Sequence, residues 1–504
     1  MDKLYSSLFQ SLLDNESGLL DPANLVSTLT HHGLCVDHDV RLRGLKTALS
    51  LLPYDTQLTQ QSFSELAKPH LSLLEKALKG QLIIPDFEHF TAKIRSIFDR
   101  VATNHSGKVA DYIPQLARTN PDYFAVTVCS TDGQIYSLGD SQVQYSVQST
   151  FKPINYCIAL ELLGEEMVHA HMGREPSGLG FNALTLNAKG LPHNPMINAG
   201  AIMGCSLIQP ELPLADRFDH VMSTWSALAG HARIDFNNSV CLAEKDQSDR
   251  NAALAHFMRE KKAFLPHTNI RETLDFYFQC CSIEVSTSIH AQIAATLANA
   301  GVCPFTSERV FSNDTLKHCL SLMYSCGMYE FSGEFAFSVG IPAKSGASGT
   351  IMLVIPGIAG IVIYSPRLDD IGNSVRGVEF SKELVKHFNF HNYDSFSYHS
   401  GKDDPCHPRV EQALQQQFAL IAAASRGDLH EIRRLISLGT DINQGDYDGR
   451  TALHLAVCEN QLATVQFLID AQAVIHAKDR WGASPVDDAK RLGYKTIEEC
   501  LISC

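Results

Sequence analysis

The first 105 residues carry apolar side chains at the three- and four-residue spacing that places one face of a helix in a core. This spacing recurs at Leu4, Leu8, Leu12 and Leu13, and again in Leu45–Leu52 and Phe87–Phe98. We therefore expect an all-helical domain over residues 1–105. The polar run Asp14–Gly18 indicates an EF-hand-like pairing of its helices. A calcium loop of that type needs a bidentate carboxylate at its twelfth position, which is Leu25 here, so we expect no calcium site.

The pattern changes between about residues 106 and 395. Phe124–Val128 predicts a strand, Thr131–Gly133 a turn, and Gln134–Ser137 a returning strand. Helical stretches follow, and two more strand regions are predicted near the end: Phe335–Ile341 and Ile351–Tyr364. Strands at both ends with helices between them predict one α+β domain over residues 106–395 whose terminal segments share a sheet.

A polar linker is expected over residues 396–414, because His399–Pro405 holds only polar, charged and turn-forming residues. After it, Ala423-Ala424, Ala456-Val457 and Ala489-Lys490 recur at intervals of 33 residues. That period, with Thr451-Ala-Leu-His-Leu-Ala, resembles ankyrin repeats, in which each helix pair buries its apolar face on the next. We expect such repeats over residues 415–504, with a protein partner on their surface and the chemistry upstream.

Composition narrows the functional class. A chain of 504 residues is too long for one hydrophobic core. The net charge of −14 argues against nucleic-acid binding, which needs a basic surface to neutralise phosphates. The longest apolar run, Ile351–Ile363, is too short to span a bilayer and contains Pro356, so we expect no membrane contact.

The cysteines and the N-terminus bear on the cellular compartment. The 14 cysteines are scattered without a Cys-x-x-Cys pair, which is typical of reduced, buried thiols in an intracellular protein and indicates no zinc or redox site. Asp2, Asp14 and Glu16 fit neither a secretory signal nor a mitochondrial presequence. No motif points to a metal or another cofactor.

Two short motifs suggest nucleophilic catalysis. Ser149 and Lys152, three residues apart at the start of a predicted helix, share one face, and a partly desolvated lysine can take the serine proton. Alone, such a pair also arises by chance. Lys344-Ser345-Gly346 lies in a strand-like run, and enzymes with the Ser-x-x-Lys nucleophile carry such a strand beside the same cleft. The N–H groups of Ala347 and Ser149 are candidates for an oxyanion hole, although a plain surface strand is the alternative.

The wider sequence resembles the serine-dependent glutaminases, most closely the animal kidney-type and liver-type enzymes, over nearly the whole chain. The similar segments are Gln148–Pro153, Pro192–Ile202, Ser248–Asn251, Asp275–Gln279, Ser325–Tyr329 and Pro342–Gly346. The resemblance implies a β-lactamase/penicillin-binding-protein-like catalytic domain that hydrolyses L-glutamine to L-glutamate and ammonia.

Residue roles follow from this resemblance. It implies that Ser149 is the nucleophile, Lys152 its base, and Tyr329 the tyrosine that helps pass a proton to the departing ammonia. Glu244 matches the carboxylate that meets the α-ammonium of the substrate, although Glu244-Lys-Asp-Gln alone would be taken for a solvated charge run. Tyr277 matches a site tyrosine, although its neighbours alone would favour a packing role.

Further substrate contacts are implied at positions from several segments of the chain. These are Tyr112, Gln148, Asn198, Asn251 and Ala347. Without the family, an isolated asparagine would be interpreted as a turn former.

The loop Leu179–Leu186 departs from the family pattern, because an arginine, a lysine and an aromatic residue usual in animal members are missing. Family members are activated by phosphate and form dimers or tetramers, so this departure bears on regulation more than on catalysis. Conservative exchanges at Ser248 and Ala347 leave the site plausible. The resemblance also implies mitochondria, whereas the N-terminal pattern leaves the cytoplasm as the alternative.

Two other functions compete with this prediction. One is another Ser-x-x-Lys hydrolase of the β-lactamase type, which shares the mechanism but is an exported protein. The other is an ankyrin adaptor whose hydrolase-like domain is inactive. Hydrolysis of nitrocefin distinguishes the first, and absence of turnover the second.

Overall fold

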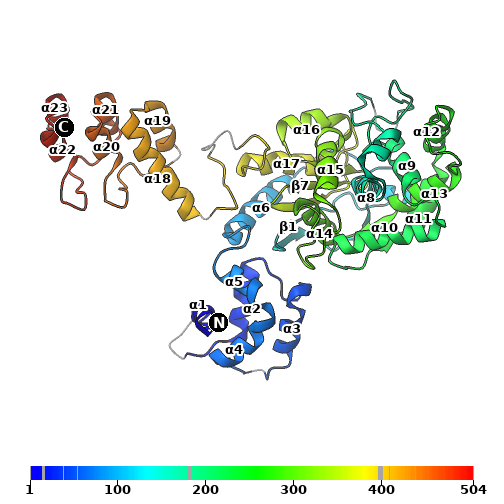
Figure 1. Ribbon diagram of the computed structural model, residues 1–504, viewed down its shortest axis with the longest axis horizontal. Coiled ribbons are helices and arrows are strands. Elements are labelled where there is room, and N and C mark those ends of the chain that lie inside the picture. The colour runs from blue at the N-terminus through cyan, green and yellow to red at the C-terminus, as the bar shows by residue number, and fades with distance from the viewer. Residues whose placement is uncertain are drawn as a thin grey trace. The chain divides into compact units, whose positions relative to one another are not determined.

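The structure is a computed structural model that describes residues 2–13, 18–37, 39–53, 55–179, 183–394, 401–407, 409–437 and 439–502. The chain forms two units, Met1–Phe396 with Asp403–Cys406, and Ser397–Lys402 with His407–Cys504 (Figure 1). Part of the predicted linker is therefore anchored on the first unit, where Asp403 Oδ2 lies 2.5 Å from Lys93 Nζ and 2.7 Å from His89 Nε2. Over the ranges given above, no helix is long and apolar enough to cross a lipid bilayer.

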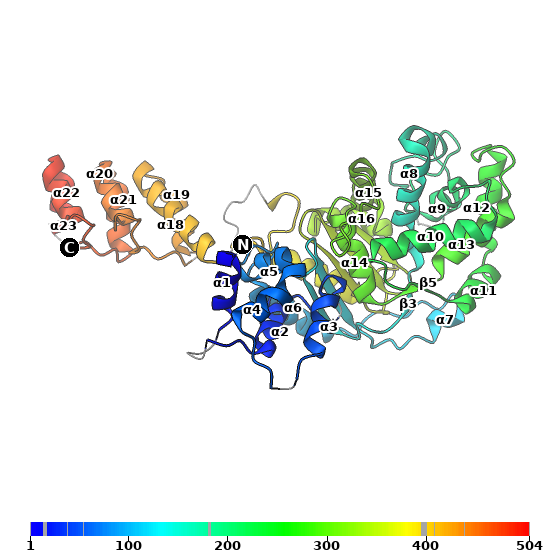
Figure 2. The ribbon, with the colours of Figure 1, turned by 60° about the horizontal axis from the view of Figure 1, so that its bottom comes forward.

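The N-terminal segment folds as two helix–loop–helix pairs and a fifth helix, drawn in blue in Figure 2. Its helices are α1 (Asp2–Ser11), α2 (Pro22–His31), α3 (Arg43–Ser50), α4 (Gln60–Ala67) and α5 (Leu71–Leu78). The loops of the two pairs meet where Leu20 and Leu58 exchange backbone hydrogen bonds of 2.9 and 2.8 Å. Leu25 and Phe63 are fully buried in the shared core, as the predicted all-helical packing requires. Residues 14–17 of the predicted polar loop lie outside the described residues.

A five-stranded antiparallel sheet in the order β2-β1-β8-β7-β6 organises the rest of the first unit. Its strands are β1 (Ala125–Ser130), β2 (Ile135–Gly139), β6 (Ala343–Gly346), β7 (Thr350–Ile355) and β8 (Ala359–Tyr364). The first strand pairs with the last, from Ala125 opposite Tyr364 to Ser130 opposite Ala359. The two ends of the predicted α+β domain therefore share a sheet, as expected.

Helices cover both faces of this sheet. Met352 and Val354 point into one core, which also receives α14 (Thr287–Ala298), while Ile351 and Leu353 point into the other. This alternation follows from the two-residue period of a strand. The second core is closed by α6 (Phe87–Ala102) and α17 (Val375–His387), so α6 packs on the sheet although it lies within the predicted domain 1–105.

The other helices of the first unit that follow α6 are drawn in cyan to yellow-green in Figure 1. They are α7 (Pro114–Ala117), η3 (Gln148–Thr150), α8 (Phe151–His171), α9 (Asn198–Leu207), α10 (Leu214–Leu228), α11 (Asn238–Asp246), α12 (Asp249–Glu260), α13 (Ile270–Cys281), α15 (Asn313–Cys326), η4 (Tyr329–Phe331) and α16 (Ser332–Ser338). A small second sheet joins β3 (Tyr145–Ser146), β5 (Ile283–Val285) and β4 (Asp235–Phe236).

The predicted strand Phe335–Ile341 is wrong, because most of this segment belongs to helix α16. Phe331, Phe335 and Val339 stand four residues apart, and the rings of the two phenylalanines are 6.4 Å apart. Phe335 and Val339 are buried in the second core. This spacing is that of a helix face, so the segment packs on the core as a helix and not as a strand.

The second unit contains helix pairs that match the 33-residue period. They are α18 (Arg409–Arg426) with α19 (Leu429–Ser437), α20 (Ala452–Cys458) with α21 (Leu462–Asp470), and α22 (Pro485–Leu492) with α23 (Lys495–Ile502). Ala423, Ala456 and Ala489, which mark the repeat in the sequence, are fully buried in one core. Small residues at these places let successive helix pairs pack closely.

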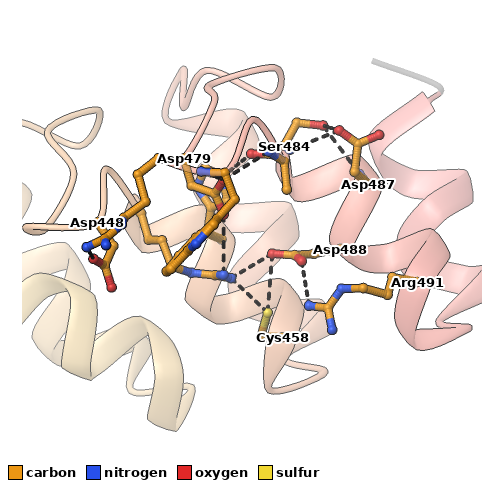
Figure 3. Close-up of polar contacts among 12 residues, drawn as sticks. Asp448, Cys458, Asp479, Ser484, Asp487, Asp488 and Arg491 are labelled. Carbon is orange, nitrogen blue, oxygen red and sulfur yellow. Dashed lines mark hydrogen bonds and ion pairs between the residues drawn. The ribbon is translucent and has the colours of Figure 1, made fainter.

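An ion-pair network centred on the buried Asp488 joins the last two helix pairs (Figure 3). Arg450 Nη2 and Arg491 Nη2 each lie 2.6 Å from a different oxygen of Asp488, and the Asp488 side chain is 1% exposed. Cys458 Sγ lies 3.0 Å from Arg450 Nη2 and 3.4 Å from Asp488 Oδ2. Because Arg450 precedes α20 and Asp488 belongs to α22, the network couples adjacent repeats.

Candidate active site

Ser149 and Lys152 lie where a short 3-10 turn, η3, leads into helix α8. The turn is closed by the Thr150 hydroxyl, which donates to Val147 O at 2.7 Å. Gln148, just before the serine, has a φ of +46°, a backbone conformation that residues other than glycine rarely adopt. Such backbone conformations persist only where the surroundings hold them, and they gather at active sites.

The Lys152 amine is buried beneath this turn, and the residue is 1% exposed. Its Nζ donates to Asn198 Oδ1 at 2.6 Å, and Asn198 Nδ2 donates to Asn251 Oδ1 at 3.1 Å. Burial lowers the pKa of Lys152 from its ordinary 10.5 to about 8, and the negative potential of nearby groups, Cys281 foremost, only partly offsets this. A lysine in this state is a competent base near neutral pH.

A second polar group consists of Glu244, Tyr112 and Gln148. The Tyr112 hydroxyl donates to Glu244 Oε1 at 2.8 Å and lies 3.2 Å from Gln148 Oε1. Glu244, on α11, is only 7% exposed, so the carboxylate is not a solvated surface charge. Burial raises the pKa of the Glu244 carboxyl, although hydrogen bonds with Tyr112 and Gln148 and the charge of Lys152 act in the opposite direction. A cation would be stabilised here.

The tyrosine of η4 closes the site from the sheet side. The Tyr329 hydroxyl donates to Ser345 O at 3.2 Å and also shares a side-chain hydrogen bond with Ser149. Burial raises the pKa of this phenol to about 12, against the opposing effect of hydrogen bonds with the side chains of Ser149 and Ser345. Tyr329 thus contacts the predicted nucleophile with its proton in place, and its φ of +56° is also left-handed.

Strand β6 approaches the Ser149 turn closely, as the Lys344-Ser345-Gly346 motif predicted. A Cβ added to Gly346 would lie 3.0 Å from Val147 O and 3.2 Å from Thr150 Cγ2, so glycine allows this approach. Ala347 follows and packs partly buried beside Ile113 and Val240. The Ser345 hydroxyl is buried on the same strand.

Helix α13 supplies the floor of the site. Tyr277 is 4% exposed, with its ring edge-on to Phe151 at 5.6 Å, and it forms a hydrogen bond with the Cys281 thiol. Burial is the main reason why the pKa of the Cys281 thiol is raised, and the charge of Glu244 raises it further. Sequence reasoning missed Cys281, because one cysteine among 14 carries no local signal of its position. Cys281 lies one helical turn after Tyr277 on α13, and this spacing was the only signal in the sequence that could have placed it near the site.

These contacts link predicted site residues from segments between Tyr112 and Gly346, whereas the Lys344 amine, which was expected in the cleft, turns to the carbonyl groups of Gly327 and Ser345. In the divergent loop Leu179–Leu186, residues 180–182 lie outside the described residues, and Leu179 and Leu184 are exposed. Across the described ranges, no cluster of three His, Cys, Asp or Glu side chains is arranged to hold a metal ion. The arrangement offers a serine, a base, a proton-bearing phenol and a separate buried carboxylate.

Comparison with known proteins agrees with this geometry. The glutaminase family model matches residues 107–393, and a model of three ankyrin repeats matches residues 378–479. The mitochondrial liver isoform of glutaminase from Mus musculus is 43% identical over 445 residues, covering 88% of this chain and 74% of its own. A glutaminase from Nostoc sp. is 41% identical over 310 residues, covering 61% of this chain and 92% of its own.

Solved structures resemble the catalytic region. The Mglu protein in its tris and glutamate form has a TM-score of 0.57 and 35% identity, with 60% of this chain and 67% of that chain covered. The β-lactamase-like α+β fold class predicted from sequence is confirmed. This chain belongs to the glutaminase family and ends in ankyrin repeats.

Proposed function

We propose that this chain hydrolyses the side-chain amide of L-glutamine to L-glutamate and ammonia, with Ser149 as nucleophile and Lys152 as base. The observation that supports this most strongly is the buried Lys152 amine, one helical turn after Ser149, with its pKa lowered to about 8. Only a neutral amine can accept the serine proton, and burial makes that form accessible near neutral pH.

The reaction proceeds in two halves. Lys152 takes the Ser149 proton while the serine oxygen bonds to the amide carbon, and the N–H groups of Ser149 and Ala347 stabilise the oxyanion. The carbon–nitrogen bond then breaks, and ammonia leaves with a proton that passes from Lys152 through Tyr329. Water repeats the sequence on the ester, giving its proton to Lys152, so that glutamate leaves and the Ser149 hydroxyl is restored.

Glu244 recognises the α-ammonium of the substrate. Burial removes water from its carboxylate and destabilises the charged form. A bound ammonium group stabilises that charged form again. Neutral polar groups then bind the carboxylate and the amide: Tyr112, Gln148, Asn198, Asn251 and Tyr277. A shorter side chain, such as that of asparagine, would place its amide away from Ser149.

Release of glutamate and ammonia from L-glutamine tests the proposal. Ser149→Ala should abolish turnover while glutamine binding, measured by calorimetry, persists. Ser321→Ala, an exposed α15 serine whose hydroxyl bonds only Lys317 O in the part of the chain described, is the matched control and should leave turnover unchanged. Folded wild-type protein without release would favour the adaptor function, and nitrocefin hydrolysis would favour another Ser-x-x-Lys hydrolase.

The family also suggests regulation and location. Phosphate activation, a homo-oligomer and a protein partner at the ankyrin repeats are proposals that the same assay with added phosphate, sedimentation and pull-down experiments test. A mitochondrial location is proposed from the relatives, with the cytoplasm as the alternative, and fluorescence imaging of the natural full-length protein distinguishes them.

A further inference from the structure

Lys344 does not lie in the cleft as its motif suggested. It is 0% exposed, and its Nζ donates to Gly327 O at 3.1 Å and to Ser345 O at 2.7 Å. The hydrogen bonds of this amine therefore go to the backbone behind the site.

Both of these carbonyl groups belong to the surroundings of Tyr329. Gly327 lies two residues before the tyrosine, and Ser345 O also accepts the hydrogen bond of the Tyr329 hydroxyl at 3.2 Å. The amine itself stands 4.6 Å from the centre of the Tyr329 ring. One nitrogen thus contacts the backbone leading to this tyrosine, the face of its ring and the acceptor of its hydroxyl.

Tyr329 needs such support because its backbone is strained. Its φ of +56° is left-handed, which costs a residue other than glycine about 1–3 kcal/mol unless its surroundings impose it. The turn is also tight, since a Cβ added to Gly327 would lie 1.8 Å from Ala343 O. Lys344 links this turn to strand β6.

The groups facing the Lys344 amine include no carboxylate partner. Among the described residues it forms no ion pair, and the titratable groups facing it are Lys152 from α8, Cys326 from α15 and Tyr329 from η4. Burial, and then the like charge of Lys152, lowers the pKa of Lys344 well below its ordinary value. Burying a lysine whose amine is bound only by carbonyl groups costs folding free energy. No contact of Lys344 with the surface of the cleft accounts for this cost.

We propose that Lys344 is a positioning residue, which holds the Tyr329 hydroxyl against Ser149 by binding the Gly327 and Ser345 carbonyl groups beneath the tyrosine ring. This inference rests on the proposed proton-transfer role of Tyr329. It assigns Lys344 no contact with substrate.

A double-mutant cycle tests this role. Lys344→Met keeps the length of the side chain and removes the amine. Because misplacing a reacting group by 1 Å costs on the order of 100-fold, we expect kcat to fall roughly 30- to 100-fold with KM changed less than about threefold. In the Tyr329→Phe background the same change should cost less than about threefold, since the hydroxyl it positions is gone. Lys386→Met, an exposed lysine of α17, is the control and should leave kcat unchanged.

Equal losses of kcat in the two backgrounds, or an effect confined to KM, would overturn the proposal. A crystal structure of Lys344→Met gives a readout that does not depend on turnover. We expect Tyr329 to leave its left-handed conformation or its hydroxyl to move by about 1 Å or more, the scale at which geometry affects rate. An unmoved Tyr329 contradicts the positioning role, whereas absence of glutaminase activity in the wild type contradicts only the proposed function.

Discussion

The pH dependence of turnover should report the state of Lys152. With its pKa lowered to about 8, the neutral amine makes up about 10% of the protein at pH 7 and about 90% at pH 9. Since only the neutral form accepts the Ser149 proton, kcat/KM should rise with pH and level off above a midpoint near 8. A lysine at the ordinary 10.5 would leave only about 0.03% neutral at pH 7.

Asn198→Asp should move this midpoint. The substitution places a carboxylate where Asn198 Oδ1 now accepts the Lys152 hydrogen bond at 2.6 Å. An opposite charge at this distance shifts a pKa by about 1–3 units, so the midpoint should move to between about 9 and 11. At pH 8 the neutral fraction then falls from about half to a tenth or less, and kcat/KM should fall at least about fivefold.

The assay is initial-rate glutamate release between pH 6 and 11, corrected for enzyme stability at each pH. Asn251→Asp, one hydrogen bond further from the amine, is the graded control and should shift the midpoint less. The reasoning fails if the wild-type profile is flat between pH 6.5 and 9.5. It also fails if Asn198→Asp lowers activity equally at every pH, because that would be a binding effect alone.

Three further substitutions test packing and electrostatics. Gly346→Ala should lower kcat tenfold or more by pushing β6 from the Ser149 turn, on the order of the cost of small misplacements, whereas Gly204→Ala, with open space around its Cβ, should keep full activity. Arg450→Ala removes one of the two arginines paired with the buried Asp488 carboxylate and should destabilise the repeats by about 1–3 kcal/mol, measured by hydrogen exchange in α20–α23. Lys152→Met should be inactive but more stable by about 3 kcal/mol at pH 7 in urea unfolding, because a pKa lowered by folding destabilises the folded state below that pKa. This gain should persist up to about pH 8 and vanish as the pH rises to 10.5.

Local sequence patterns determined much of the architecture. The hairpin of β1 and β2 follows from two strand-like runs on either side of the turn Thr131–Gly133, and the repeat helices follow from a 33-residue period. The proximity of Ser149 and Lys152 follows from their spacing on a helix. These features depend on neighbours along the chain, which is why periodicity finds them. At Phe335–Ile341 the predicted strand is a helix, because the four-residue spacing of Phe331, Phe335 and Val339 matches a helix face that packs on the core.

The tertiary structure alone decided the chemistry of the site. Tyr112 and Glu244 are 132 residues apart, and only packing brings the hydroxyl to the carboxylate. The same holds for Cys281 beside Lys152 and for the direction in which Lys344 points. Residue type sets the ordinary pKa of a group, but burial sets the free energy of its charged form. The sequence by itself could therefore name Lys152, and only the fold that buries its amine lowers its pKa.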